Sequence, residues 1–124
     1  MRRGLLLFAH GARDPGWAAP FEAVASQLRV LRPDAEVRLA FLEFMAPTLA
    51  EAGAALVAAG CTNVDVVPLF LGAGGHVRKD VPQLMSQLQA AHPSTRFALH
   101  PAIGEHGAVI AAMAAAAASL TENP

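Results

Sequence analysis

The chain has 124 residues, of which 54% are hydrophobic and 15% are charged. This length suits one domain, and the apolar content is sufficient for a core, which excludes a disordered chain. The formal charge of -1 provides no overall field for nucleic acid or an anionic membrane, so an anionic partner must be bound by a local site. The single cysteine, Cys61, excludes a disulfide scaffold and a zinc site built from several cysteines.

The N-terminal segment has two arginines and an apolar run, but it does not read as a secretory signal. The run from Leu5 to Ala9 is too short for the hydrophobic region of a signal peptide, and His10 interrupts it. The longest uncharged apolar run, Ala108 to Ala118, is shorter than a membrane span. We therefore expect a cytoplasmic protein that binds neither a membrane nor nucleic acid.

Four apolar segments are predicted to be strands. The first, Gly4 to His10, and the third, Val64 to Leu71, are apolar on both faces, which is typical of central strands in a parallel sheet covered by helices. The second, Glu36 to Glu43, alternates in polarity, and the fourth, Arg96 to His100, is short. The second and fourth strands are therefore expected to flank the central pair.

Segments with apolar residues at helical spacing alternate with these strands. Helices are expected before Pro33, from Pro47 to just before Gly60, before Pro93 and from Gly107 to Leu120. The resulting βαβαβαβα pattern predicts a single α/β domain over residues 1–124. We expect a doubly wound, four-stranded parallel sheet of order 2-1-3-4, with helices on both faces.

The carboxyl ends of the strands carry the side chains that can bind a ligand or take part in a reaction. In this strand order, the topological switch where ligands bind lies between the first and third strands. The first strand delivers His10 there, the third delivers His76, and the second ends at Glu43. Neighbouring strands are about 4.8 Å apart, so the two imidazoles are expected to approach one ion or one substrate atom. Glu43 has a second interpretation, as a charge that favours the N-terminus of the second helix.

Glycines and basic residues accompany the two histidines. Gly74 and Gly75 either allow a tight turn into the third helix or leave the backbone bare for a large flat ligand. Arg13, Arg78 and Lys79 are candidates to hold carboxylates or phosphates, and the alternative is a solvated surface paired with nearby aspartates. The glycine spacing matches neither the dinucleotide fingerprint nor the Walker motif.

Three stretches resemble the short CbiX/SirB-type class II chelatases, which insert a divalent metal into sirohydrochlorin. They are His10-Gly11-Ala12-Arg13-Asp14-Pro15, Phe41-Leu42-Glu43 followed by Pro47-Thr48-Leu49, and the segment from Pro68 to Val77. The resemblance covers nearly the whole chain, although Ala12 stands where many relatives have serine. It implies a flavodoxin-like, chelatase-like domain without a permanent cofactor, and a homodimer. It also implies metal-binding and catalytic roles for His10 and His76, with a looser match at Glu43.

The expected reaction is insertion of Co²⁺, Ni²⁺ or Fe²⁺ into this tetrapyrrole, with release of two pyrrole protons. Neutral imidazole suits these ions, and two histidine ligands leave positions open for water and then pyrrole nitrogen. Either His10 or His76 can accept a pyrrole proton, and Glu43 can orient a histidine or relay the proton. The basic residues and glycines named above are expected to bind the substrate.

The same pattern has two other interpretations. A non-catalytic metal or tetrapyrrole carrier on the same fold needs the same two histidines, so the sequence does not separate it from a chelatase. A histidine-dependent phosphatase is disfavoured because its chemistry needs an arginine directly before the first His-Gly pair, where this chain has Ala9. The pathway served, whether cobalamin, siroheme or a nickel tetrapyrrole, is open at this point.

Overall fold

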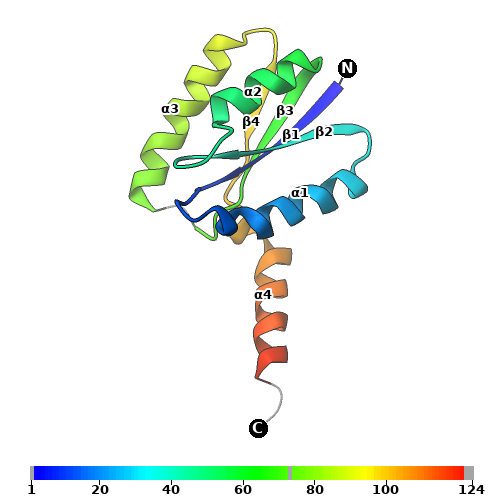
Figure 1. The fold of residues 1–124 in the computed structure, drawn as a ribbon, viewed down its shortest axis with the longest axis vertical. Helices are drawn as coiled ribbons and strands as arrows, with labels where there is room; N and C mark the ends of the chain where they lie inside the picture. The colour runs from blue at the N-terminus through cyan, green and yellow to red at the C-terminus, as the bar shows by residue number, and fades with distance from the viewer. Residues whose placement is uncertain (1, 73, 122–124) are drawn as a thin grey trace.

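The computed structural model describes residues 2–72 and 74–121, with His76 described in its backbone alone. Within these residues, four parallel strands form one sheet of order β2-β1-β3-β4 (Figure 1). The strands are β1 (Arg2–Ala9), β2 (Ala35–Phe41), β3 (Cys61–Pro68) and β4 (Arg96–Leu99). The predicted strand order, with β1 and β3 at the centre, is confirmed.

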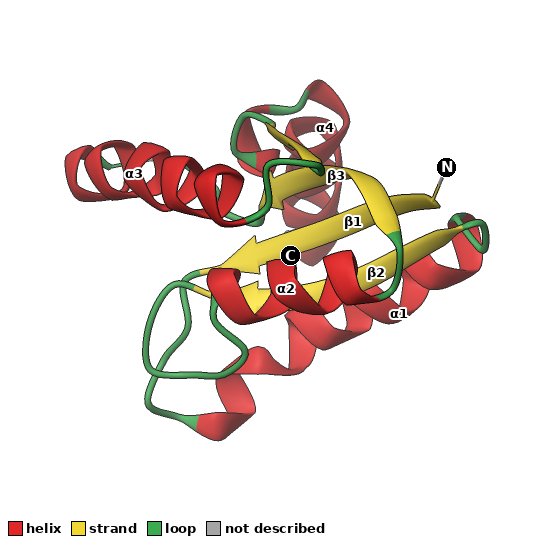
Figure 2. Cartoon of the chain, turned by 90° about the horizontal axis from the view of Figure 1, so that it is seen from above, coloured by secondary structure: helices red, strands yellow, loops and turns green. Residues whose placement is uncertain are grey.

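Helices lie on both faces of this sheet, as predicted. The helical segments are η1 (Pro15–Ala18), α1 (Ala19–Leu31), α2 (Leu49–Ala58), α3 (Gly75–Ala91), η2 (Ile103–Glu105) and α4 (Gly107–Leu120). Helix α1 packs on one face, and α2 and α3 pack on the other (Figure 2). Helix α4 has the predicted bounds but extends away from the sheet, and it contacts mainly η2 (Figure 1). None of the helices in the described part of the chain has the length and apolar content needed to span a bilayer.

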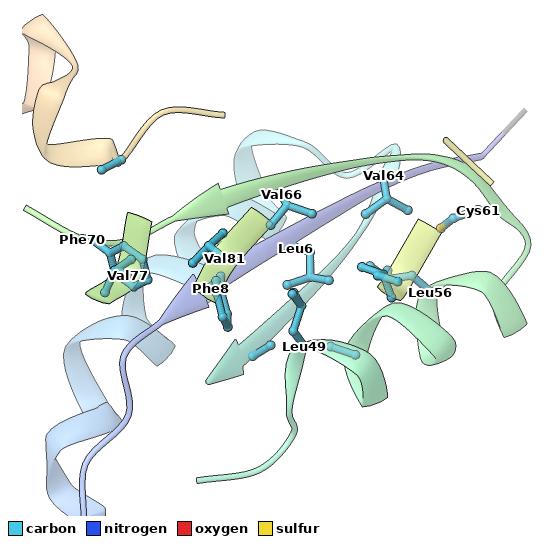
Figure 3. Packing of buried hydrophobic residues seen from close by; sticks show 14 residues of the cluster. Leu6, Phe8, Leu49, Leu56, Cys61, Val64, Val66, Phe70, Val77 and Val81 are labelled. Atoms are coloured by element: carbon cyan, nitrogen blue, oxygen red, sulfur yellow. The ribbon is translucent and has the colours of Figure 1, made fainter. Parts of the chain in front are cut away.

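The larger hydrophobic core lies between the sheet and the helices α2 and α3. Leu6 and Phe8 of β1, with Val64 and Val66 of β3, pack there against Leu56 of α2, and all five are almost completely buried (Figure 3). The intervening residues of β1 face α1 in a smaller cluster. The central strand is thus apolar on both faces because each face has its own core.

The observed ends of β3 lie three residues earlier in the chain than the predicted ends, Val64 and Leu71. Pro68 has no N–H group to continue the ladder, so the strand ends there. Phe70 lies beyond the strand and is nevertheless 2% exposed, because it fills the end of the core from the loop. The apolar run therefore continues past the strand. The predicted bounds were wrong because they were taken from the apolar run, whereas the strand is defined by its backbone hydrogen bonds.

Candidate functional site

The backbone brings His10 and Glu43 together just beyond β1 and β2. The amide of Leu42 donates to the carbonyl of Ala9 at 2.9 Å, and the amide of Glu43 donates to the carbonyl of His10 at 3.0 Å. Gly11 permits this close approach, since its φ is +89° and a Cβ there would overlap the carbonyl oxygen of Glu43. Two of the predicted site residues therefore occupy adjacent positions at one edge of the sheet.

The imidazole of His10 stacks on Phe70, which follows β3. The two ring centroids are 4.1 Å apart with an interplanar angle of 32°. Phe70 is buried, and the amide of the preceding Leu69 donates to the carbonyl of Phe8 at 2.8 Å, which ties this segment to β1. His10 itself is half-buried. Its ring is thus held between the ends of the two central strands while part of it stays open to solvent.

The backbone places His76 as the second residue of α3, which begins at Gly75. The sequence analysis placed His76 at the carboxyl end of the third strand and gave no start for the third helix; in the structure His76, Arg78 and Lys79 lie in the first turns of α3. Helical spacing did not reveal this start because glycine is a poor helix former. The predicted role of the His76 side chain lies outside the described residues, so it stays a prediction.

The two glycines at the start of α3 require no left-handed backbone. Gly74 is the N-cap, with φ of -73° and ψ of 170°, and its carbonyl accepts a hydrogen bond from the amide of Arg78 at 2.9 Å. A Cβ at Gly74 or Gly75 would meet nothing within 4 Å. A tight turn therefore does not explain these glycines, and the bare backbone is accessible. The first amides of a helix lack intrahelical acceptors, so the exposed N–H groups at the start of α3 are able to bind an anionic group.

The three basic candidates lie on different segments around the strand ends. The guanidinium of Arg13 lies 4.6 Å from the centroid of the Phe44 ring, so the loops after β1 and β2 touch. Arg78 lines a hollow of about 200 Å³ between α3 and the segment that follows β4. Lys79 is exposed on α3. All three side chains are thus available to an anionic ligand from solvent.

Two small hollows flank the strand ends. One is the hollow beside Arg78, and the other, of about 270 Å³, lies between Glu43 and the polar face of α3 formed by Asp80, Gln83 and Gln87. Pockets that enclose organic ligands usually measure roughly 300–1,000 Å³. A large flat ligand would therefore lie across the strand ends instead of inside either hollow.

Among the described side chains, which leave out that of His76, no group of three His, Cys, Asp or Glu residues is placed to hold a metal ion. A structural zinc site usually has four protein ligands, and a catalytic zinc site has three. Glu43 and His10 are thus neighbours through their backbones, without forming a closed ligand cage in the described part of the chain.

The sequence reasoning missed two residues that shape this edge. The ring of Phe70 packs against the His10 imidazole, and Gly104 holds the turn that follows β4 against the Phe70 segment. The amide of Gly104 donates to the carbonyl of Phe70 at 2.9 Å, and a Cβ at Gly104 would overlap the backbone of Leu71. The available signal was the apolar run Leu69-Phe70-Leu71, which continues past Pro68, where the strand ends.

Several known proteins are similar to this chain in sequence. The profile of the CbiX family matches residues 4–120. Sirohydrochlorin cobaltochelatase of Methanosarcina acetivorans is 35% identical over 83 residues, which cover 67% of this chain and 64% of the relative. The enzyme of the same name from Saccharolobus solfataricus is 39% identical over 82 residues, which cover 66% of this chain and 62% of the relative. The matches thus span less than two thirds of each relative's length.

Solved structures show the same architecture. A crystal structure from Marinobacter aquaeolei, described as a CbiX protein of cobalamin (vitamin B12) biosynthesis, superposes with a TM-score of 0.85 at 32% identity, over 97% of this chain and 98% of that one. SirB of Bacillus subtilis with Fe³⁺ has a TM-score of 0.83 at 25% identity, over 97% of this chain and 48% of that one. The sirohydrochlorin chelatase SirB of B. subtilis subspecies spizizenii, in complex with cobalt, has a TM-score of 0.74 at 26% identity, over 82% and 44%. Because the family profile covers almost the entire sequence and the fold agrees with it, this chain belongs to the CbiX family.

Proposed function

We propose that this chain inserts a divalent metal ion into sirohydrochlorin, with release of two pyrrole protons. The supporting relatives are named sirohydrochlorin cobaltochelatases, and a similar solved structure is a sirohydrochlorin chelatase in complex with cobalt. The observation that carries the proposal is that His10 and the backbone of His76 follow the adjacent central strands β1 and β3. This is the switch point, where a ligand reaches both strand ends.

The metal is a substrate in this reaction and must be held weakly enough to leave. Imidazole nitrogens suit Co²⁺, Fe²⁺ and Ni²⁺, and two such ligands leave coordination positions for water and then for pyrrole nitrogen. Cobalt and iron are favoured by the SirB structures that contain Co or Fe³⁺. Nickel is supported by ligand chemistry alone. No permanent cofactor is part of the proposed reaction.

Proton removal is the second requirement. Imidazole is a common general base in proteins, so we assign to His10 or His76 the acceptance of a pyrrole proton as the metal enters the ring. The Glu43 amide donates a hydrogen bond to the His10 carbonyl, so the carboxylate and the imidazole extend from neighbouring points on the backbone. We assign to Glu43 the orientation of a histidine or the relay of the released proton to solvent.

Sirohydrochlorin carries carboxylates around its ring, and the basic residues match them in charge. Arg13, Arg78 and Lys79 are proposed to pair with these carboxylates from different sides of the strand ends. The open backbone at Gly74 and Gly75 lets the flat ligand approach the first amides of α3. Binding that depends on such ion pairs weakens as the salt concentration rises.

Two copies of the chain are proposed to form the active unit, in the cytoplasm and without a nucleic-acid or membrane partner. The two hollows beside Arg78 and Glu43 are small compared with the pockets that enclose organic ligands. SirB of B. subtilis matches almost all of this chain with only 48% of its own length. The rest of SirB is about as long as a second copy, which supports a homodimer here.

Absorbance spectroscopy of sirohydrochlorin during metal insertion tests the proposed function. The purified chain is mixed with a large excess of sirohydrochlorin and Co²⁺, and Fe²⁺ and Ni²⁺ are tested in parallel without oxygen. A chelatase converts many equivalents of the tetrapyrrole per chain. A carrier stops at one equivalent, and that outcome would replace the proposal with the carrier alternative.

Histidine variants test the assigned residues. His10→Ala and His76→Ala should each lower turnover by about 100-fold or more, because a general base contributes that much. His92→Ala is the matched control, since His92 is the C-cap at the far terminus of α3. Arg78→Ala should mainly raise KM. Turnover like that of the wild type in the folded His10/His76 double variant would contradict the assignment.

A further inference from the structure

Phe44, the residue after Glu43, has a backbone conformation and an environment that are unusual for phenylalanine. Its φ is +66°, in the left-handed region that residues with a Cβ disfavour. Among the described residues, the others with a positive φ are both glycines, Gly11 and Gly60. Phe44 is also 57% exposed, so the fold gains little from burying its ring. Neither backbone preference nor burial therefore explains phenylalanine at this position.

The residues on both sides of Phe44 are held by contacts with the rest of the domain. Before it, the amide of Glu43 donates to the His10 carbonyl at 3.0 Å. After it, Met45 packs against the buried hydrophobic cluster that contains Phe41. The loop thus directs one apolar side chain, that of Met45, into the core. Phe44 stays outside the core, one residue from the backbone contact with His10 at the edge where the strands end.

The ring of Phe44 contacts the loop that begins with His10. The loops after β1 and β2 project together beyond the strand ends (Figure 2), and the guanidinium of Arg13 lies over the Phe44 ring, 4.6 Å from its centroid. An exposed cation–π contact is weak, so it does not by itself offset a left-handed backbone at phenylalanine. The contact does place a cation against an aromatic ring that is still mostly open to solvent.

We propose that Phe44 is a specificity-determining residue, whose ring stacks on the flat face of the tetrapyrrole and holds Arg13 beside the tetrapyrrole's carboxylates. This deepens the substrate binding proposed above and rests on the proposed function. A tetrapyrrole is flat and apolar at its centre and anionic at its edge, and an aromatic ring paired with a guanidinium matches both properties. Residues with strained backbones are concentrated at sites where a side chain acts on a ligand, which agrees with this role.

The side chain of Phe44 has no atom that binds a metal ion or moves a proton, so its contribution is confined to the tetrapyrrole. Loss of the ring should raise KM for sirohydrochlorin and leave kcat and KM for Co²⁺ like those of the wild type. Because the ring also positions the Arg13 guanidinium, part of the effect of Arg13→Ala should disappear once Phe44 is replaced. The losses of affinity in the double variant should therefore be less than additive.

Absorbance titration of metal-free sirohydrochlorin with the full chain tests the contact without metal insertion. Phe44→Gly and Phe44→Asn both remove the ring, and both new residues tolerate the left-handed backbone, so these variants should fold. Each should raise the dissociation constant about 10-fold, the contribution of one aromatic stacking contact. Phe44→Trp keeps an aromatic ring and should bind like the wild type.

Val30→Ala is the matched control for the loss of an exposed apolar side chain. Val30 is 80% exposed and lies in the last turn of α1, at the opposite edge of the sheet (Figure 2). This variant should bind sirohydrochlorin like the wild type. Circular dichroism checks that all the variants are folded, and sedimentation velocity checks that they have the same oligomeric state.

The outcomes separate this inference from the proposed function. If folded Phe44→Gly binds sirohydrochlorin as tightly as the wild type, or loses only kcat, the inference is overturned, and turnover by the wild type still supports the proposed function. A changed oligomeric state with unchanged tetrapyrrole binding also overturns it, since Phe44 then contacts a second copy. A wild type that binds sirohydrochlorin without turnover, together with a weakly binding Phe44→Gly, supports the contact and makes the chain a carrier. A wild type that binds no sirohydrochlorin overturns both.

Discussion

Replacement of Gly11 by alanine tests how the backbone builds the site. The φ of Gly11 is +89°, in the left-handed region that side chains other than glycine disfavour. A Cβ there would also overlap the carbonyl oxygen of Glu43, whose amide is bonded to the His10 carbonyl. Gly11→Ala therefore has two separate costs: a strained backbone, and the displacement of the Glu43 segment.

Gly60 isolates the first of these costs. Its φ is +91°, but a Cβ at Gly60 would meet nothing within 4 Å, so Gly60→Ala should lower the free energy of unfolding by about 1 kcal/mol. Overpacking adds about 1–3 kcal/mol, which brings Gly11→Ala to about 2–4 kcal/mol. Gly75 has neither constraint, and Gly75→Ala should change the free energy by less than about 1 kcal/mol.

Urea unfolding followed by circular dichroism measures the three variants against the wild type. All are compared at one protein concentration, because association of chains makes the apparent stability depend on concentration. The expected order of destabilisation is Gly11→Ala, then Gly60→Ala, then Gly75→Ala. If Gly11→Ala loses no more stability than Gly60→Ala, the Glu43 carbonyl does not pack against Gly11 and the predicted cost of overpacking is wrong.

Three further predictions concern the scaffold. Leu56→Ala should cost about 2–5 kcal/mol in urea unfolding, since Leu56 is completely buried. Thr48→Ala should cost about 1 kcal/mol in the same assay, because Thr48 and Glu51 form a reciprocal capping box at α2, with bonds of 2.9 and 3.1 Å. Burial raises the pKa of the Cys61 thiol, so a thiol reagent at pH 8 should modify Cys61 much more slowly in the folded chain than in urea; equal rates would contradict its burial.

The sheet and its order were predictable because apolar runs report burial directly. Leu5 to Phe8 and Val64 to Val67 are apolar runs, or nearly so, which is what a central parallel strand requires, and both strands are central. The positions of His10 and Glu43 followed from this order alone. The strand order did not predict the backbone hydrogen bond between these two residues or the need for glycine at position 11. Both depend on how far β2 continues alongside β1.

The parts that sequence did not reveal are those where residue type and structure are weakly linked. The first turn of α3 begins with glycine and carries basic residues, so its helical state depends on its tertiary setting. The direction of α4 is a second case. Its alanines indicate a helix, but its path is set by the close packing of Gly104 on Leu71, a contact between segments more than thirty residues apart.

The same contact joins the turn before α4 to the candidate site, and this leads to a last prediction. Phe70 stacks on His10, and its carbonyl accepts from the amide of Gly104, two residues before the N-cap of α4. A Cβ at Gly104 would overlap the backbone of Leu71, whereas a Cβ at Gly107 would meet nothing within 4 Å. We therefore expect Gly104→Ala to displace the surface beneath His10 and to lower kcat of metal insertion, and Gly107→Ala to leave kcat unchanged. If folded Gly104→Ala turns over as fast as the wild type, the packing of this turn does not position His10.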